Sequence, residues 1–476
     1  MIDLSAHKDK TIAVMGLGKS GLTTARALCD AGADVRAWDD SEAAREAAVT
    51  SGIPVVDLAG QNAKDWAETE FLVLSPGIPH THPEPHPAAA AAKKAGTKII
   101  GDVELLVRAN RAARFIAITG TNGKSTTTAL IGHILKSAGY TTAVGGNLGT
   151  PVLDFPALDT NGIYVLELSS YQLELTPSLH ASVSVLLNIS ADHLDRHGGM
   201  KGYIAAKQRI FQNQTSDDAA VVGIDEPNST EIFGSLAANG NQPAIPISGH
   251  QSARGGVFSI DRVLYDDRDR AKLPIVSLDG AETLPGDHNA QNAAAAAAAC
   301  LMAGLAPEDI ADGITSFPGL AHRQQLAAII DGVRYVNDSK ATNADAAARA
   351  LGSYRTIYWI AGGLAKEGGL DDLMDGLAPI RHAFLIGEAE ADFAEALEGN
   401  LPTTRCGTLA NALEKAHQLA QRERRDGAVV LLSPACASWD QYPSFEARGA
   451  EFCRLAAALP GSARDVFWDG ETEEAA

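Results

Sequence analysis

Short runs of apolar, mostly β-branched residues alternate with longer amphipathic stretches along the whole of this chain. In the first hundred residues such runs lie at 11–15, 34–38, 71–74 and 98–101, and we predict a strand at each. The first run leads into Gly16-Leu-Gly-Lys-Ser-Gly21 and an amphipathic stretch that reaches Ala31. This pattern predicts a strand–turn–helix–strand unit of the Rossmann type, and we expect the segment to end near residue 102.

The remainder of the chain repeats the alternation in two further segments. In residues 103–318 we predict strands at 116–119, 164–168, 183–188 and 219–224, an irregular excursion at about 249–272, and a closing helix at 289–303. In residues 319–468, after a hinge at Phe317-Pro-Gly-Leu320, strands are predicted at 333–336, 356–361, 383–386 and 428–432. Strands that alternate with helices predict parallel sheets, so we assign the chain to the α/β class. Residues 469–476 are acidic, and we expect them to be disordered.

Composition and charge restrict where this protein works and what it binds. Charged residues make up 21% and hydrophobic residues 45% of the 476 positions, and no window approaches the roughly 18 uninterrupted apolar residues of a membrane span. The polar start of the chain predicts no signal peptide, so we expect a cytoplasmic protein without membrane association. A formal charge of −20 argues against nucleic-acid binding, which depends on Lys and Arg. The five cysteines form no C-x-x-C pair and are expected to be reduced, buried thiols; they are Cys29, Cys300, Cys406, Cys436 and Cys453.

The most informative segment is Ile116-Ala-Ile-Thr-Gly-Thr-Asn-Gly-Lys-Ser-Thr126, in which a β-branched strand runs into a glycine turn where a helix must begin. Backbone N–H groups around Gly120 and Gly123, the helix N-terminus and the Lys124 ammonium can bind phosphate, and the Ser125 hydroxyl can hold Mg²⁺. A strict Walker A motif has glycine where this chain has Ile118, so the loop is a shorter variant. The alternative is a chance glycine–lysine–serine sequence on a surface turn, which the flanking strand and helix disfavour.

The earlier turn, Gly16-x-Gly18-x-x-Gly21, also has a nucleotide-binding pattern. Alone it indicates a dinucleotide cofactor, with Asp39 or Asp40 about 20 residues further on contacting a ribose hydroxyl. A glycine turn of this kind can equally serve another nucleoside diphosphate, or it can be a tight turn that needs small residues for packing. The sequence leaves these alternatives open.

From the phosphate loop onward the chain resembles the Mur ligases, which extend the peptide of the bacterial cell-wall precursor. Further stretches agree with that family in order, over nearly the whole chain: Ser75-Pro-Gly-Ile78, Gly145-Gly-Asn-Leu-Gly149, Glu167-Leu-Ser-Ser-Tyr-Gln-Leu-Glu174, Asp192-His-Leu-Asp-Arg196 with Ala206-Lys-Gln-Arg209, Asn337-Asp-Ser-Lys-Ala-Thr-Asn343, and Leu432-Ser-Pro-Ala-Cys-Ala-Ser438 with Phe445-Glu-Ala-Arg-Gly449. The last two stretches most resemble the branch of the family that adds D-glutamate.

This resemblance implies three domains and an ATP-dependent ligation. The domains are a UDP-substrate-binding Rossmann-like domain (1–102), a central ATP-binding domain of the P-loop type (103–318) and a C-terminal Rossmann-like domain that binds the amino acid (319–468). The implied partners are UDP-N-acetylmuramoyl-L-alanine and D-glutamate, and the implied cofactors are ATP, two Mg²⁺ ions and a CO₂-derived carbamate on Lys207. ATP would convert an inert carboxylate into an acyl phosphate, which the amine then attacks. We expect a monomer.

The resemblance also assigns residues to ATP and to metal. The ATP-binding set is Gly120, Thr121, Asn122, Gly123, Lys124, Ser125, Thr126, Asn289, Arg323 and Asp338. Lys124, Glu167, His193 and Lys207 form the catalytic set, and the metal ligands are Ser125, Glu167, His193 and the carbamate on Lys207. An ammonium can neither react with CO₂ nor ligate a metal, whereas a lysine with a lowered pKa can be carbamylated. Taken singly, Glu167 could be a solvated strand-end acid and Lys207 a salt-bridged surface lysine.

The two remaining sets concern the substrates. By resemblance the UDP substrate is bound by Gly18, Lys19, Ser20, Asp40, Ser41, Gly77 and Asn147, and the amino acid by Lys340, Thr342, Lys366, Ser433 and Phe445. Lysines with hydroxyl and N–H donors suit the two carboxylates of glutamate and would offset the negative field of the chain.

Three competing functions stay open on the sequence. The first is another ligase of the superfamily, such as a folylpolyglutamate synthetase or a different Mur enzyme, and Ser433-Pro-Ala-Cys-Ala-Ser438 speaks against the former. The second is an NAD(P)-dependent oxidoreductase that uses the Gly16–Gly21 turn. The third is a nucleotide-gated binding protein without turnover.

Overall fold

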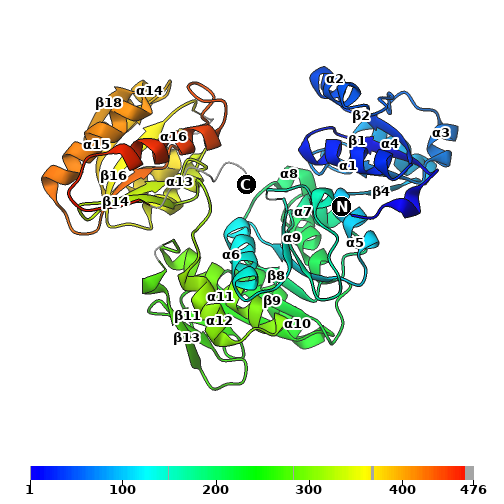
Figure 1. The fold of residues 1–476 in the computed structure, drawn as a ribbon, viewed down its shortest axis with the longest axis horizontal. Helices are drawn as coiled ribbons and strands as arrows, with labels where there is room; N and C mark the ends of the chain where they lie inside the picture. Colours follow the sequence, from blue (N-terminus) through cyan, green and yellow to red (C-terminus); the bar gives the residue numbers. More distant parts are fainter. Residues whose placement is uncertain (1, 148, 282, 366–368, 467–476) are drawn as a thin grey trace. The chain divides into compact units, whose positions relative to one another are not determined.

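The computed structural model of this protein describes residues 2–147, 149–281, 283–365 and 369–466. By their internal contacts the residues fall into two units, the first made of residues 1–277 with 290–315 and the second of residues 278–289 with 316–476. Both units consist of helices packed on parallel-rich sheets, which confirms the predicted α/β class (Figure 1).

A parallel sheet in the strand order β2-β1-β3-β4 forms the N-terminal part of the first unit (blue in Figure 1). Its strands are β1 (Thr11–Met15), β2 (Asp34–Trp38), β3 (Phe71–Leu74) and β4 (Lys98–Ile100), and its helices are α1 (Lys19–Asp30), α2 (Glu42–Thr50), α3 (Ala63–Glu68), α4 (Pro87–Ala95) and α5 (Asp102–Ala109). The central strands β1 and β3 are buried on both faces, as in sheets that helices cover on both sides. The predicted Rossmann-type unit is confirmed.

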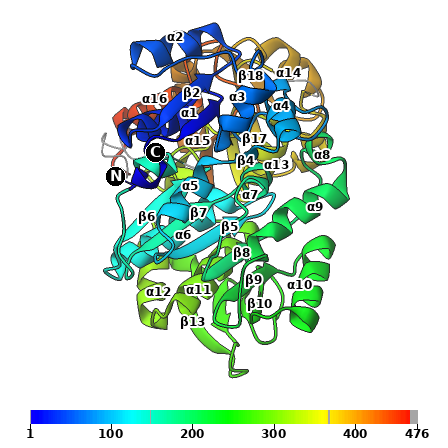
Figure 2. The ribbon, with the colours of Figure 1, turned by 90° about the vertical axis from the view of Figure 1, so that its right-hand side faces the viewer.

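The larger sheet of the first unit has the order β13-β12-β11-β10-β9-β8-β5-β7-β6, and Figure 2 shows β6, β7, β5, β8, β9 and β10 following one another across it. Its strands are β5 (Arg114–Thr119), β6 (Thr142–Gly146), β7 (Ile163–Glu167), β8 (Val183–Leu186), β9 (Ala219–Gly223), β10 (Ala244–Ser248), β11 (Val257–Ile260), β12 (Val263–Asp266) and β13 (Leu273–Ser277). Its helices are α6 (Lys124–Ser137), α7 (Ser170–Glu174), α8 (Leu194–His197), α9 (Met200–Gln208), α10 (Pro227–Asn239), α11 (Asp287–Ala303), whose first residues belong to the second unit, and α12 (Pro307–Thr315). Neighbouring strands from β6 to β11 run parallel, so their carboxyl ends meet at one edge.

The segment 249–272, which we predicted to be irregular, contains strands. Strands β11 and β12 form an antiparallel hairpin, and β13 pairs with β12 in the same sense. The hairpin turn consists of Asp261 and Arg262, both at positive φ (48° and 59°). Two-residue hairpin turns with positive φ normally carry glycine or asparagine. This turn carries neither, so the sequence did not indicate a hairpin.

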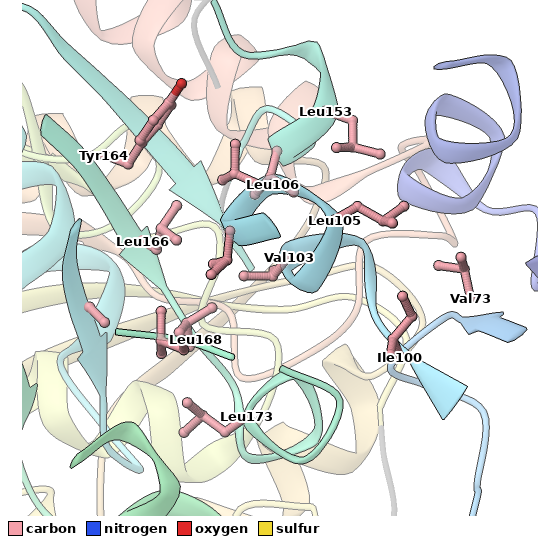
Figure 3. Close-up of a cluster of buried hydrophobic side chains, with 14 of the residues drawn as sticks. Val73, Ile100, Val103, Leu105, Leu106, Leu153, Tyr164, Leu166, Leu168 and Leu173 are labelled. Atoms are coloured by element: carbon pink, nitrogen blue, oxygen red, sulfur yellow. The ribbon is translucent and has the colours of Figure 1, made fainter. Parts of the chain in front are cut away.

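Helix α5 joins the two sheets of the first unit through buried apolar side chains. Figure 3 shows Val103, Leu105 and Leu106 of this helix between Val73 and Ile100 on one side and residues of β7 on the other. These residues belong to one buried cluster, which continues through Tyr164, Leu166, Leu168 and Leu173. This shared cluster places the N-terminal sheet in the same compact unit as the central sheet.

The second unit has a sheet in the order β18-β17-β16-β19-β15-β14-β20, drawn in yellow to red in Figure 1. Its strands are β14 (Gln325–Ile330), β15 (Val333–Asn337), β16 (Thr356–Gly362), β17 (Ile380–Ile386), β18 (Thr403–Gly407), β19 (Ala428–Leu432) and β20 (Arg464–Val466), and its helices are α13 (Ala344–Leu351), α14 (Glu390–Ala396), α15 (Leu409–Glu423) and α16 (Phe445–Ala458). Strands β15 to β18 and β19 are parallel, whereas β14 and β20 are antiparallel additions at one edge. The predicted strands are confirmed here, and the predicted disorder of 469–476 lies outside the described residues.

None of the five cysteines, all of which the structure describes, takes part in a disulfide, and each is buried except Cys29, which is half-buried. Over the described ranges, no helix combines the length and the apolar character that crossing a bilayer requires.

Substituting Gly21 should destabilise the N-terminal sheet region. A Cβ at Gly21 would lie 1.8 Å from the carbonyl oxygen of Gly16, so Gly21→Ala should cost about 2 kcal/mol or more of unfolding free energy by overpacking. Gly18→Ala is the matched control because nothing lies within 4 Å of its Cβ position, and it should cost less than about 1 kcal/mol. Urea denaturation followed by tryptophan fluorescence measures the unfolding free energy of both variants. Equal losses of unfolding free energy in the two variants would contradict the close contact at Gly21.

Candidate functional site

The turn between β5 and α6 has the backbone of a phosphate-binding loop. Gly120 and Gly123 have positive φ of 155° and 82°, and a Cβ at Gly123 would lie 2.2 Å from Oδ1 of Asn292. Only glycine fits both the conformation and the space at this position. The turn opens at the carboxyl edge of the sheet, where α6 starts at Lys124 and the N–H groups of its first turn point toward the loop.

Hydrogen bonds from the strand-end segment after β8 fix this loop. The backbone N–H of Thr121 donates to the carbonyl of Asn188 (3.0 Å), and that of Asn122 donates to Asn188 Oδ1 (2.8 Å). The Thr121 hydroxyl bonds the carbonyl of Ser190 (3.2 Å) and the Tyr203 hydroxyl (3.1 Å). We predicted a strand at 183–188, but β8 ends at Leu186 because the next two residues turn toward the loop.

Lys124 lies over the loop that it follows. Its ammonium donates to the carbonyl oxygens of Gly120 (3.0 Å) and Thr121 (2.8 Å). This places a positive charge beside the loop N–H groups, as phosphate binding requires.

Glu167 ends β7 and is 2% exposed, so it is not a solvated strand-end acid. Its Oε1 accepts a hydrogen bond from Asn147 Nδ2 (2.9 Å), while its Oε2 is buried without a hydrogen-bond partner among the described residues. An unsatisfied buried carboxylate oxygen is costly, and a bound cation would satisfy it. Carboxylate and hydroxyl oxygens are the ligands that Mg²⁺ prefers, so Glu167 and Ser125 fit a magnesium ion.

Lys207 on α9 is 2% exposed, so it is not the salt-bridged surface lysine that the sequence alone would favour. Its Nζ donates to the carbonyl of Gly120 (2.8 Å) and lies 4.8 Å from the ring centre of Tyr203. Burial, and next the nearby charge of Lys124, lower the pKa of Lys207 to about 7, although Asp192 and Glu167 oppose the shift. A large fraction of this side chain is therefore a neutral amine near neutral pH.

His193 is positioned differently from the other predicted metal ligands. It precedes α8 with a positive φ of 49°, and its side chain is 55% exposed. Its Nε2 lies 3.5 Å from Asp192 Oδ2, and its ring lies beside Tyr171 with centroids 5.3 Å apart. Within the part of the chain that the structure describes, no three His, Cys, Asp or Glu side chains gather as a ready-made metal cluster.

The first glycine turn is partly filled by the protein itself. The two carboxylate oxygens of Asp39 accept N–H bonds from Leu17 (2.6 Å) and Ser41 (2.8 Å). Asp40 is exposed and pairs with His86 Nε2 at 3.1 Å.

The other predicted UDP residues have defined contacts. Lys19 Nζ donates to the carbonyl of Gly149 (3.2 Å), and the Gly77 carbonyl accepts from Arg196 (2.7 Å). The Ser41 hydroxyl caps α2, and Gly18 and Ser20 begin α1. Gly18 and Gly77 are open, since no atom lies within 4 Å of a Cβ built on either.

Asp338 is the most perturbed acid of the second unit. Burial raises the pKa of its carboxyl to about 7, although Oδ2 accepts from the Ser433 hydroxyl (2.8 Å) and Oδ1 from the N–H of Gln324 (3.2 Å). Arg323 opposes the shift through its charge. Ser433 is fully buried in this bond, which does not favour its predicted contact with an amino acid.

Of the remaining predicted residues of this unit, Lys340 lies close to Phe445 and to Thr342. Lys340 Nζ lies 5.2 Å from the ring centre of Phe445, and the N–H of Thr342 bonds the Lys340 carbonyl (2.9 Å). Asn289 donates to the Pro285 carbonyl (2.8 Å). Lys366 lies outside the described residues.

The sequence reasoning missed residues that hold the site from a distance. Asn188 and Asn292 contact the phosphate loop from separate segments, and neither stands in a pattern that marks it. Arg448 is 1% exposed and ties α16 to the ends of two strands through the carbonyls of Ser339 and Cys436 (3.0 Å each). Burial lowers the pKa of Arg448 to about 10.

A glycine loop at a parallel sheet edge, with a buried amine and an unpaired carboxylate oxygen beside it, defines a phosphate-binding α/β protein. Family descriptions match most of the chain: the MurD-like N-terminal domain of Mur ligases at residues 10–101, the Mur ligase middle domain at 118–300 and the Mur ligase glutamate ligase domain at 322–436. The chain belongs to the Mur ligase family. The predicted three-domain architecture is confirmed, while the domain boundaries that we drew stay predictions.

Individual relatives resemble the chain over nearly its full length. It is 50% identical over 474 residues to the UDP-N-acetylmuramoylalanine–D-glutamate ligase of Rhodospirillum rubrum, covering 98% of this chain and 99% of that protein. It is 52% identical to the ligase of the same name from Paramagnetospirillum magneticum, covering 96% and 99%.

Two solved structures are similar to this chain in fold. The UDP-N-acetylmuramate–alanine ligase MurC of Thermotoga maritima matches with a TM-score of 0.54 at 16% identity, over 90% of this chain and 95% of that one. MurF of Acinetobacter baumannii matches with a TM-score of 0.52 at 19% identity, over 90% and 89%.

The buried amine of Lys207 should make stability depend on pH. Because its folded pKa of about 7 lies below the unfolded value of 10.5, the unfolded chain holds the proton between these values, and stability rises with pH across that window. Relative to Lys207→Met, the unfolding free energy of the wild type should therefore rise by on the order of 4 kcal/mol from pH 7 to 10.5. Urea denaturation in CO₂-free buffer measures it, and Lys201→Met, at an exposed position of the same helix, should show no such trend. If the difference in unfolding free energy between the wild type and Lys207→Met stayed constant with pH, that result would contradict the burial of the amine.

Proposed function

We propose that this protein is an ATP-dependent ligase that joins D-glutamate to UDP-N-acetylmuramoyl-L-alanine, in the cytoplasm, as a step of peptidoglycan precursor synthesis. The observation that carries the proposal is Glu167 Oε2, which is buried without a hydrogen-bond partner in the described part of the chain, at the same sheet edge as a glycine loop of the phosphate-binding type. The names of relatives about half identical over nearly the whole chain support the choice of substrates.

The reaction would proceed in two steps. In the first, an oxygen of the substrate carboxylate bonds to the γ-phosphorus of ATP while the bond to the β-phosphate oxygen breaks, which releases ADP and leaves an acyl phosphate. In the second, the amine of D-glutamate bonds to the carbonyl carbon, the acyl C–O bond breaks, and phosphate and a proton leave. Phosphoryl transfer needs positioning and positive charge, which the loop N–H groups and Lys124 supply.

Residues of the first unit fit the magnesium that this chemistry uses. Glu167 Oε2, the Ser125 hydroxyl, His193 and a carbamate on Lys207 would hold two ions. Mg²⁺ there would neutralise charge on the phosphate oxygens. The pKa of about 7 makes the Lys207 amine available to CO₂, with an N–C bond formed and a proton lost, and the product would offer oxygen ligands where the amine offers none.

The substrate sets complete the proposal. Gly18, Lys19, Ser20, Asp40, Ser41, Gly77 and Asn147 would contact the UDP substrate, Asn289, Arg323 and Asp338 the nucleotide, and Lys340, Thr342, Lys366, Ser433 and Phe445 the amino acid. The open surface at Gly18 and Gly77 supports the first set, since backbone can approach a ligand there. We further propose that the protein acts as a monomer.

The direct test measures ADP release. ADP release over many turnovers should require MgATP, UDP-N-acetylmuramoyl-L-alanine and D-glutamate together, whereas without the amino acid at most one ADP per enzyme molecule should form, and L-glutamate should not replace the D-isomer. Lys124→Ala should lower kcat/KM at least 1,000-fold, in line with a loss of about 4 kcal/mol of charge stabilisation. Lys136→Ala, at an exposed position of the same helix, should keep wild-type turnover. ADP release that ignores the acceptor amino acid would contradict the ligase assignment.

The carbamate can be tested separately through Lys207→Ala. This variant should lose activity, and added short carboxylates such as acetate should restore part of it by supplying the missing oxygen ligands. Lys201→Ala on the same helix should stay active and should not respond to acetate. Full activity of Lys207→Ala without any addition would contradict the role of the carbamate.

A further inference from the structure

Four parallel strands end side by side next to the phosphate loop, and a line of hydrogen bonds crosses their ends. The strand order β10-β9-β8-β5 places the segments after these strands next to one another at the carboxyl edge. Asn122 follows β5, Asn188 follows β8, and Asp225 follows β9, while Gln291 reaches the same edge from α11. Asn188 and Gln291 are 7% and 8% exposed, so water competes little for their amides.

The bonds connect the loop to Asp225 without interruption. Asn188 pairs with both backbone groups of Asn122, since its Oδ1 accepts the N–H (2.8 Å) and its Nδ2 donates to the carbonyl (3.2 Å). The same Nδ2 donates to Gln291 Oε1 (3.2 Å), and Gln291 Nε2 donates to Asp225 Oδ2 (2.8 Å). We refer to Asn188, Gln291 and Asp225 as the amide relay.

The direction of these hydrogen bonds depends on Asp225, the one residue of the amide relay whose side chain is not an amide. A primary amide has a donor and an acceptor end and can turn over, whereas a carboxylate only accepts. Asp225 therefore forces Gln291 to present its nitrogen to Asp225 and its oxygen to Asn188. Asn188 must then present nitrogen to Gln291, and its oxygen is left for the N–H of Asn122.

Asp225 is itself held in place from the neighbouring strand end. The N–H of Gly249 donates to its Oδ2 (2.8 Å), and the Ser248 hydroxyl at the end of β10 bonds Oδ1. A reversed Asn188 amide would set donor against donor at the N–H of Asn122 and leave buried groups unpaired, which is unfavourable.

We propose that Asp225 and Gln291 are positioning residues for nucleotide binding, which act by fixing the orientation of the Asn188 amide and, through it, the backbone of the phosphate loop. Neither residue touches the nucleotide in this account. The proposal rests on the proposed function only in that the loop binds ATP.

Removing each link of the relay tests this. Asp225→Ala removes the carboxylate that accepts from Gln291 Nε2, so the Gln291 amide is free to turn over. Gln291→Met removes the amide that joins Asp225 to Asn188 and nearly preserves the size of the side chain.

Binding of MgADP to the full chain, measured by calorimetry, is the readout, together with KM for ATP and kcat. Each single variant should weaken MgADP binding and raise KM for ATP about tenfold, as expected for about 1.4 kcal/mol, with a smaller change in kcat. The double variant Asp225→Ala with Gln291→Met should lose no more affinity than the more affected single variant, because both changes break the same line of bonds. Asp217→Ala is the matched control, because this exposed carboxylate at the other end of β9 undergoes the same change and should bind like the wild type.

Three outcomes would overturn the proposal. The first is single variants that bind MgADP like the wild type, and the second is a double variant whose loss of binding free energy equals the sum of the losses of the two single variants. The third is a uniform loss of thermal stability with nucleotide affinity unchanged in folded protein. A wild-type chain without affinity for MgADP would overturn the proposed function as well, so that failure is distinguishable from the others.

Discussion

The close contact between the phosphate loop and the strand ends around it is the constraint on which the rest of the site depends. Gly123 sits where any side chain would collide with Asn292, and the loop N–H groups of Thr121 and Asn122 are bonded to Asn188. These contacts hold the backbone of the loop in place, and the N-terminus of α6 lies where the proposed phosphate site would need it. Such preorganisation is what phosphoryl transfer requires, because the protein contributes position and charge more than covalent chemistry.

Burial gives the charged residues around this loop their chemical character. The chain carries a net charge of −20, so an anionic nucleotide must be held by local cations. Lys124 supplies one, while Lys207, buried beside it, has a pKa lowered to about 7 and so contributes an amine more than a charge. Glu167 has the complementary property, since one oxygen is bonded and the other is buried without a partner in the described structure. A neutral amine and an unsatisfied carboxylate oxygen next to a phosphate loop are a poor arrangement for stability, but they suit a site completed by CO₂ and a divalent ion.

Strands with a continuous run of apolar side chains could be predicted from the sequence. Strands whose residues show no such pattern, and which form through tertiary contacts, could not. Continuous apolar runs such as those of β5, β7 and β19 are buried on both faces and were assigned correctly. Strand β14 reads Gln-Leu-Ala-Ala-Ile-Ile and β18 reads Thr-Thr-Arg-Cys-Gly, and neither has a strand-like alternation. The phosphate loop and its lysine could be identified because glycine and lysine at that spacing serve one chemistry. Asn188, Gln291 and Asp225 could not, because they are ordinary polar residues until the strand order brings them to one edge.

The central claim is that ATP activates the substrate carboxylate as an acyl phosphate. The most direct test uses UDP-N-acetylmuramoyl-L-alanine labelled with ¹⁸O in both carboxylate oxygens, followed by mass analysis of the phosphate released during ligation. The account predicts one ¹⁸O atom in each phosphate, because the oxygen that bridged the acyl carbon and phosphorus leaves with phosphorus. Phosphate free of ¹⁸O, formed together with the new amide bond, would contradict it.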